Sequence, residues 1–336
     1  MKKPISIREV AEASGVSIST VSRVLNPNQK VKISDSVSFR VKATAEKLGY
    51  ISNLTAASLR MQKTQAIGMV VPDLLNPLFP SIIKGVQDVL SKNGYVLLTV
   101  CSNNDVQNAT SEVFNLLSRR VDGIIMASAF LEDESISYCT KQNIPMVVVN
   151  RTINDGHLVH QILNDDALGI NLAVEYLFKL GYQSLVHIAG PQNISQGKIR
   201  LQQFKSSCMR LNLDYQIIEA EEFTIDSGKK AAKAILFHSQ QPLGIIAAND
   251  LIAIGAIDTL KAIGHRIRED FSIIGYNNTL LTDRLDPPLT TISISHLKMG
   301  EAAAELLLSE IESPAKIKRK VLLPPKLEIR QSTKFI

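Results

Sequence analysis

Apolar residues recur at helical spacing in residues 7–25, IREVAEASGVSISTVSRVL, near the start of the chain. Gly15 interrupts this spacing, and glycine can adopt the positive φ that a sharp turn requires. Before the glycine, Ala11 leaves room for a second helix to approach closely. After it, Val21 and Val24 provide the buried face of that helix. The pattern therefore predicts two short helices joined by a tight turn.

The second predicted helix has a polar start. Ser17 is suited to cap it, because its hydroxyl can accept a hydrogen bond from a free backbone N–H group. The side chains that the helix would expose are Ile18, Ser19, Ser22 and Arg23. Short polar groups and an arginine near the N-terminal end are typical of helices that enter the major groove of DNA. A helical hairpin in some other kind of domain is the alternative interpretation.

A third helix is predicted over residues 34–50, ending at Gly49. Its apolar face would close a small three-helix core with Val37, Val41, Ala45 and Leu48. Residues 53–62, NLTAASLRMQ, have helix propensity, but a helix this short does not persist alone in water. This segment is therefore interpreted as either a conditional helix or a linker.

Beyond Thr64 apolar, strand-like runs alternate with amphipathic helical segments. The runs are residues 66–72, 95–101, 121–127 and 144–150, and then 184–190, 243–249 and 271–278. Such alternation predicts parallel sheets covered by helices on both faces. Two series of runs indicate two Rossmann-like lobes, and the default ligand site is a cleft between them, beyond the carboxyl ends of the strands.

The positive charge of the chain is concentrated at its N-terminal end. Residues 1–63 hold eleven Lys or Arg against four Asp or Glu, a net charge of +7, whereas the whole chain carries +5. The remaining residues, 64–336, are therefore slightly negative, at −2. This division is expected when one small module faces phosphate groups and the rest of the protein does not.

Several other classes of protein find little support in the sequence. The three cysteines are widely spaced, which favours reduced thiols over a disulfide framework or a metal site. No apolar run could span a membrane and the start does not resemble a secretory signal, so we expect a cytoplasmic protein. His157 and His160 lack further ligands at metal-binding spacing, and the glycine-rich and nucleophile motifs of common enzymes are missing. We expect no metal, no cofactor and no enzyme activity.

Eight landmarks in order resemble the lactose-repressor (LacI/GalR) family of bacterial transcription regulators. The resemblance spans essentially the whole chain. The landmarks are IREVAEASGVSISTVSRVLN at 7–26, EKLGY at 46–50, IGMVVPDLLNPLFPSIIKGV at 67–86, RRVDGIIM at 119–126, AANDLIAIGA at 247–256, FSIIGYNN at 271–278, DPPLTTI at 286–292 and LLPPKLEIR at 322–330.

The resemblance implies a helix-turn-helix headpiece over residues 1–50, a hinge helix or linker over 51–63, and an effector-binding core over 64–336 that forms homodimers. The core would resemble periplasmic binding proteins, with the chain crossing between its lobes near Asn164, Ser293 and Pro324. Lobe 1 would comprise about 64–164 plus 294–323, and lobe 2 about 165–293 plus 324–336.

The resemblance also assigns residues that contact DNA. Ile18, Ser19 and Arg23 fall where the family reads bases, and a guanidinium can bind the O6 and N7 atoms of guanine together. Residues of suitable size for phosphate contacts are Ser17, Thr20, Ser22 and Asn26. The alternative interpretation is that Arg23 contacts a phosphate group or is an ordinary surface charge.

Leu59 falls where the family's hinge helix inserts an apolar wedge into the minor groove. The alternative is that Leu59 packs the linker against the core. The familiar hinge has proline at position 52 and often arginine at 57, whereas this chain has Ser52 and Ala57. These departures put hinge stability and the minor-groove charge contact in doubt.

For the effector, the resemblance implies a site between the lobes. Its residues would be Leu78, Phe79, Asn150, Arg200, Phe223, Asn249, Asp250 and Asn277. Arg200 matches the family's ligand-holding arginine, although the small residues that usually follow are replaced by Gln202 and Gln203. Sugar-binding members often have aspartate where this chain has Asn150 and Asn277, and the loss of carboxylates lowers the penalty for an anionic ligand.

The sequence thus predicts a repressor that binds a pseudopalindromic operator in double-stranded DNA as a homodimer. A small hydroxyl-rich effector, such as a sugar or sugar acid, would control it from the cleft. Two alternatives stay open at this point. One is a regulator controlled by a partner phosphoprotein docking on the core, and the other is a sugar-binding receptor without a DNA role.

Overall fold

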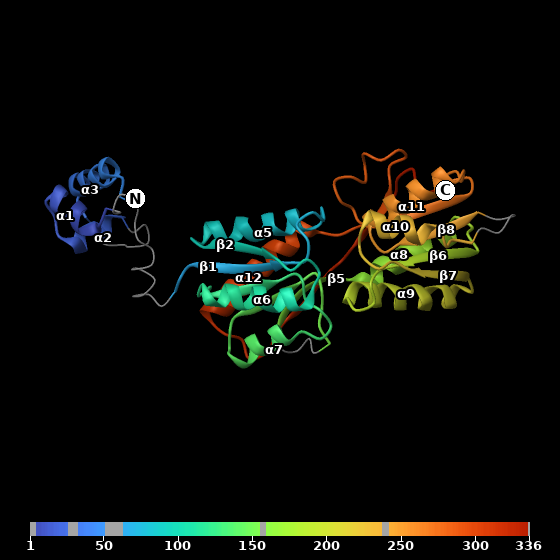
Figure 1. Cartoon of the computed structure of the whole chain (residues 1–336), viewed down its shortest axis with the longest axis horizontal. Helices are drawn as coiled ribbons and strands as arrows, with labels where there is room; N and C mark the ends of the chain where they lie inside the picture. The colour runs from blue at the N-terminus through green and yellow to red at the C-terminus, as the bar shows by residue number, and fades with distance from the viewer. Residues whose placement is uncertain (1–4, 26–32, 51–62, 155–158, 237–241, 335–336) are drawn as a thin grey trace. The chain divides into compact units, whose positions relative to one another are not determined.

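The computed structural model describes residues 5–25, 33–50, 63–154, 159–236 and 242–334 (Figure 1). The chain divides into two compact units, Met1–Thr64 and Gln65–Ile336. Residues Asn26 and Leu59, both predicted to contact DNA, lie outside the described residues.

The N-terminal unit contains three helices, α1 (Ile7–Ser14), α2 (Ile18–Leu25) and α3 (Asp35–Leu48). Their shared core consists of Val10, Ala11, Val21, Val41 and Ala45, with Val24 and Leu48 packed against it. Gly15 ends α1 in the left-handed conformation, with a φ of 64°. This residue therefore makes the predicted turn between the first two helices.

The second unit begins with a six-stranded sheet in the order β11-β5-β4-β3-β1-β2. Its strands are β1 (Ala66–Val71), β2 (Val96–Cys101), β3 (Gly123–Met126), β4 (Met146–Val149), β5 (His160–Asn164) and β11 (Lys320–Leu323). Its helices are α5 (Phe79–Lys92), α6 (Val106–Ser118), α7 (Glu134–Lys141) and α12 (His296–Glu312). We call this sheet with its helices the first lobe.

The second lobe contains another six-stranded sheet, in the order β12-β10-β9-β8-β6-β7. Its strands are β6 (Ser184–Ala189), β7 (Asp214–Glu219), β8 (Leu243–Ala247), β9 (Phe271–Asn277), β10 (Thr290–Ser293) and β12 (Lys326–Glu328). Its helices are α8 (Asp166–Lys179), α9 (Ser195–Leu211), α10 (Ile225–Ala232) and α11 (Asp250–Ala262). Figure 1 shows helices on both faces of each sheet.

The chain passes between the two sheets three times. The passages follow Asn164 at the end of β5, Ser293 at the end of β10, and Leu323 at the end of β11. Strand pairing in both described sheets is parallel apart from that of β10 with β12. The predicted fold class, a helical headpiece with a core of two α/β lobes, is confirmed.

Helix α12 completes the first lobe although it comes from the C-terminal part of the chain. It packs closely on α5: a Cβ atom added at Gly85 would collide with the carbonyl oxygen of Leu297, and one at Gly300 with that of Ile82. Met299 and Leu307 of α12 are completely buried, and Leu307 lies close to Gly123 of β3. Glycine is required at positions 85 and 300 because the helix backbones touch there.

Candidate functional site

The start of α2 carries a cluster of hydroxyl groups. Ser17 Oγ accepts a hydrogen bond from the backbone N–H of Thr20 at 3.2 Å, so Ser17 caps the helix as predicted. The same oxygen lies 2.8 Å from Ser19 Oγ and 2.9 Å from Thr20 Oγ1. Ile18, with 41% of its surface exposed, and Arg23 are exposed on the helix. These groups can contact DNA without any loss of core packing.

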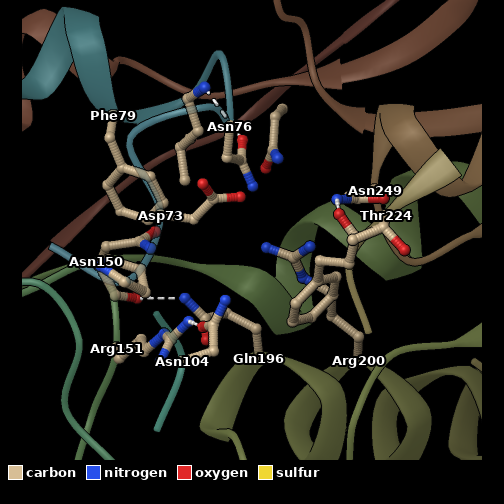
Figure 2. Close-up of a pocket in the computed structure, with 14 residues that line it drawn as sticks. Asp73, Asn76, Phe79, Asn104, Asn150, Arg151, Gln196, Arg200, Thr224 and Asn249 are labelled. Atoms are coloured by element: carbon tan, nitrogen blue, oxygen red, sulfur yellow. Dashed lines mark hydrogen bonds between the residues drawn. The ribbon is translucent and has the colours of Figure 1, made fainter. Parts of the chain in front are cut away.

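A pocket lies between the two lobes and encloses about 500 Å³, which includes space open to solvent (Figure 2). The first lobe contributes Pro72, Asp73, Asn76, Leu78, Phe79, Asn104, Asn150 and Arg151, and the second lobe Gln196, Arg200, Phe223, Thr224, Asn249 and Asn277. Most of these residues follow a strand or begin a helix, as expected for a site at the carboxyl edge of a parallel sheet.

Arg200 is held in place by its own lobe. Its Nε and Nη2 atoms donate to Asp166 Oδ1 at 3.0 and 2.7 Å, and Nη1 donates to the carbonyl oxygen of Ala248. The guanidinium also stacks on Tyr276, with Cζ 3.6 Å from the ring centroid. Arg200 is 2% exposed and Asp166 is 6% exposed. This buried ion pair fixes the arginine before any ligand is present.

Arg151 lies in the first lobe and has a different environment. It is 4% exposed, and burial lowers the pKa of its guanidinium to about 10. Its Nη2 donates to Asn104 Oδ1 at 2.7 Å and its Nη1 approaches the Ser128 carbonyl oxygen at 3.5 Å. Within the described part of the chain, Arg151 makes no ion pair with a carboxylate.

Two asparagines of the pocket have unusual backbone conformations. Asn150 follows β4 with a φ of 68°, and Asn277 ends β9 with a φ of 112°. Asparagine adopts positive φ more readily than most residues, and aspartate shares this property. The local backbone therefore accounts for a short polar residue at each position without reference to a ligand. Gln196 anchors Asn150 by donating from Nε2 to its carbonyl oxygen at 2.9 Å (Figure 2).

Of the eight residues predicted for the effector site, seven line this pocket. Asp250 does not. Its Oδ2 accepts hydrogen bonds from the backbone N–H of Thr279 at 2.8 Å and from its hydroxyl at 3.1 Å, and its Oδ1 accepts from Thr291 at 2.6 Å. Burial raises the pKa of this carboxyl to about 6. Asp250 thus fixes the segment that follows Asn277 and does not reach the ligand space.

The sequence interpretation missed seven lining residues, namely Pro72, Asp73, Asn76, Asn104, Arg151, Gln196 and Thr224. Their place along the chain could have indicated most of them, because polar residues that follow a buried parallel strand lie at the edge where ligands bind. Arg151 directly follows Asn150, and Asp73 comes two residues after β1. Asp166, the partner of Arg200, was also missed.

The structure also bears on the metal-binding and membrane-spanning features considered in the sequence. His160 is buried, with Nε2 2.9 Å from Glu310 Oε2, and its Nδ1 accepts from the backbone N–H of Arg319. The described residues contain no group of three or more side chains that could hold a metal ion. None of the described helices combines the length and apolar character needed to cross a bilayer.

The two parts of the chain match known families. Residues 6–53 match the bacterial regulatory proteins of the lacI family, and residues 174–333 match a periplasmic binding protein-like domain. A helix-turn-helix unit followed by a two-lobed binding core defines a class of ligand-responsive regulators.

Proteins that are similar over the whole length of the chain identify its family. The chain is 30% identical over 329 residues to the ribose operon repressor of Halalkalibacterium halodurans, covering 98% of this chain and 97% of the relative. It is also 30% identical over 336 residues to the transcriptional repressor CytR of Escherichia coli, covering 98% and 97%. The chain belongs to the LacI family of bacterial regulatory proteins.

Solved structures agree with this assignment. The Lac repressor dimer bound to operator and the anti-inducer ONPF has a TM-score of 0.88 and 27% identity, covering 98% of this chain and 99% of that one. A LacI-family regulator from Enterococcus faecium with bound ribose has a TM-score of 0.70 and 30% identity, covering 80% and 98%.

Proposed function

We propose that this chain is a sequence-specific DNA-binding repressor that acts as a homodimer in the cytoplasm. A small hydroxyl-rich ligand, such as a sugar or sugar acid, would control its affinity for a pseudopalindromic operator. The observation that carries this proposal is the pocket lined by residues of both lobes. A ligand that contacts both lobes favours one orientation of the lobes over others, and DNA that favours another orientation would compete with it.

Names of similar proteins support the same function. Relatives are ribose operon repressors and the repressor CytR, and structures related at 27–30% identity contain operator DNA or ribose. The headpiece would comprise residues 1–50 and the hinge residues 51–63, with lobe boundaries as the sequence predicts. No described feature favours an enzyme, so we propose a purely regulatory role.

We propose roles for individual residues in DNA binding. Arg23 would read a guanine, Ile18 would contact a thymine methyl group, and Ser19 would tolerate either base pair. Phosphate contacts would come from Ser17, Thr20, Ser22 and Asn26, and Leu59 would be the minor-groove wedge.

For the effector, we propose contacts from residues that line the pocket. Phe79 and Phe223 would provide apolar faces, and Arg200 would use the two N–H groups that its own lobe leaves free. The remaining contacts would come from Leu78, Asn150, Asn249 and Asn277. Asp250 would act indirectly, by holding the segment after Asn277.

Binding-site selection with the full chain and with Arg23→Ala tests the DNA function. The unsubstituted chain should select a two-fold symmetric site. Arg23→Ala should lose about 1–3 kcal/mol of discrimination at one symmetric base pair. Arg40→Ala, which removes an exposed arginine of α3, is the control and should leave the selected sequence unchanged. Equal weakening of Arg23→Ala on all sequences would reassign this residue to a phosphate contact.

A further inference from the structure

Side-chain amides of the pocket use their oxygen atoms within the protein. Asn76 Oδ1 accepts from the backbone N–H of Leu78, Asn104 Oδ1 from Arg151, and Asn249 Oδ1 from the backbone N–H of Ile252. A backbone N–H or a guanidinium can only donate, so the orientation of these three amides is fixed by chemistry. The amide nitrogens of Asn76 and Asn104 thus remain as donors for a ligand, whereas Asn249 Nδ2 also donates to the carbonyl oxygen of Phe223 at 3.2 Å and keeps one N–H group.

The other side-chain amides of the pocket do not outweigh these donors with acceptors. The side chains of Asn150 and Asn277 make no hydrogen bond to another described residue, so each can donate or accept. Gln196 Oε1 is a buried acceptor without a partner among the described atoms. Hydroxyl groups on a ligand would satisfy such acceptors. The pocket thus combines an excess of donors with a few acceptors suited to hydroxyl groups.

Charge adds to the excess of donors. The fourteen lining residues include two arginines and one acid, Asp73. Arg200 is neutralised by Asp166, at 2.7 Å. Asp73 is half-buried, accepts from the backbone N–H of Leu75, and makes no ion pair with Arg151 in the described structure. Arg151, whose Cζ lies 5.8 Å from the centroid of the Phe130 ring, is therefore a buried cation that no carboxylate among the described residues neutralises.

Two helix N-termini add further positive charge to the pocket. Helices α5 and α9 both begin at the pocket, and neither has a hydrogen bond from an N-cap side chain. Their N-cap residues, Leu78 and Ile194, cannot supply one. The N-terminal end of a helix carries a partial positive charge, which favours an anion nearby. In contrast, α10 and α11 are capped by Thr224 and Asn249.

We infer that the effector of this pocket is a hydroxyl-rich oxyanion, a sugar acid or a sugar phosphate, whose anionic group binds Arg151. This inference deepens the proposed function and rests on it. A carboxylate or phosphate would supply the counter-charge that Arg151 lacks and would accept hydrogen bonds from its unused N–H groups. The hydroxyl groups of the ligand would meet Gln196 and Asp73, and Phe79 and Phe223 would contact its carbon skeleton.

Matched pairs of probes test the inference by calorimetry with the full chain. The pairs are glucose and glucuronate, galactose and galacturonate, and ribose and ribose 5-phosphate. In at least one pair the anion should bind about tenfold to a hundredfold more tightly than the neutral sugar, as expected for charge-assisted hydrogen bonds in a buried site. The pair that shows the preference distinguishes a carboxylate from a phosphate.

Variants then locate the anionic group. Arg151→Gln should reduce the preference to about threefold or less, whereas Arg151→Lys, which keeps the charge, should retain part of it. Arg284→Gln is the control: it removes the same charge from a side chain that is 82% exposed. The control should bind every probe as the unsubstituted chain does. Melting curves without ligand show whether each variant is folded.

Three results would overturn the inference. If a neutral sugar binds as tightly as its anionic partner in every pair that binds, the effector is a neutral polyol and the proposed function stands. If Arg151→Gln weakens neutral and anionic probes equally while it is folded, the anion is not bound at Arg151. If none of the six probes binds, the inference fails together with the small-molecule part of the proposed function.

Discussion

Arg200 and Arg151 are two buried arginines, one from each lobe, that line the same pocket in opposite ways. Arg200 is 2% exposed and binds Asp166, a backbone carbonyl and the face of Tyr276. Arg151 is 4% exposed, and its hydrogen-bond acceptors in the described part of the chain are neutral, namely Asn104 and the Ser128 carbonyl. The same side chain is thus part of the scaffold in the second lobe and an unneutralised cation in the first.

This difference teaches that the identity and burial of a residue do not determine its role. A buried ion pair resists rearrangement, because breaking it leaves an isolated charge in a medium of low dielectric constant. A buried cation with neutral neighbours instead gains stability from any anion that reaches it. We therefore expect Arg200 to matter mainly for stability of the ligand-free protein, and Arg151 mainly for binding.

The largest effect should come from Asp166→Asn. The substitution leaves the Arg200 guanidinium buried without its counter-charge, which should lower the free energy of unfolding of the core by about 3–5 kcal/mol. Urea unfolding followed by circular dichroism measures this change. Glu175→Gln is the matched control, because Glu175 pairs with Arg210 at 2.9 Å on the surface. It should cost at most about 1 kcal/mol. Equal costs for the two variants would show that Asp166 contributes no more than a surface charge.

A smaller effect concerns Asp250, a buried carboxylate that is held by hydroxyl and amide donors. Its pKa is raised from 3.8 to about 6, mainly by burial. The folded chain therefore takes up a proton before the unfolded chain does as the pH falls from 6 to 4, which adds stability on acidification. His187 and His296 act in the opposite direction, because burial lowers their pKa from 6.5 to about 4.

Asp250→Asn removes the stabilising proton uptake by Asp250 and keeps the destabilising effect of the two buried histidines. Between pH 6.5 and 4 the variant should lose about 2–3 kcal/mol more stability than the unsubstituted chain. Urea unfolding at several pH values across this interval measures the slope. Asp258→Asn, on the exposed side of the same helix, should leave the slope unchanged. If the slope of Asp250→Asn matches that of the unsubstituted chain, Asp250 does not titrate in this interval.

The smallest effect should be that of Arg151→Gln in the absence of ligand. The variant loses a hydrogen bond to Asn104 but no longer buries an unneutralised charge, so its stability should lie within about 1 kcal/mol of the unsubstituted chain. Arg200→Gln, measured under the same conditions, should lose several times as much unfolding free energy, because it leaves Asp166 unpaired. If both variants lose the same stability, the contrast between the two arginines is wrong.

Much of the fold could be predicted from the sequence where burial and apolar character coincide. The seven apolar runs became β1, β2, β3, β4, β6, β8 and β9. Strand β5 was missed although all its residues are buried, because its sequence, HQILN, contains polar residues with specific distant partners. His160 binds Glu310, 150 residues away, and Gln161 accepts from Thr152. Strand β7 was missed because its sequence, DYQIIE, has no continuous apolar run. Strand β2, which is also a half-buried edge strand, was predicted because its sequence, VLLTVC, is almost wholly apolar.

The pocket could be predicted in position but only partly in composition. The rule that ligands lie beyond the carboxyl ends of parallel strands placed it correctly between the lobes. That rule does not say which polar residues are used up by internal contacts. Asp250 and Asn249 are neighbours at one strand end, yet only Asn249 reaches the pocket. The pairing of Arg200 with Asp166 depends on the packing of α8 against α9, which a local pattern does not contain.

The three passages between the lobes have a consequence for synthesis of the chain. The first lobe begins at β1, but the helix that covers α5 is made only after the entire second sheet except β12. On the ribosome, the face of α5 that carries Gly85 and Ile82 therefore stays uncovered until residues 296–312 emerge. During that interval the second lobe can already form most of its core. The lobe that begins first in the sequence is thus finished only after most of the second lobe has been made, and a chain that stops before α12 lacks a finished first lobe.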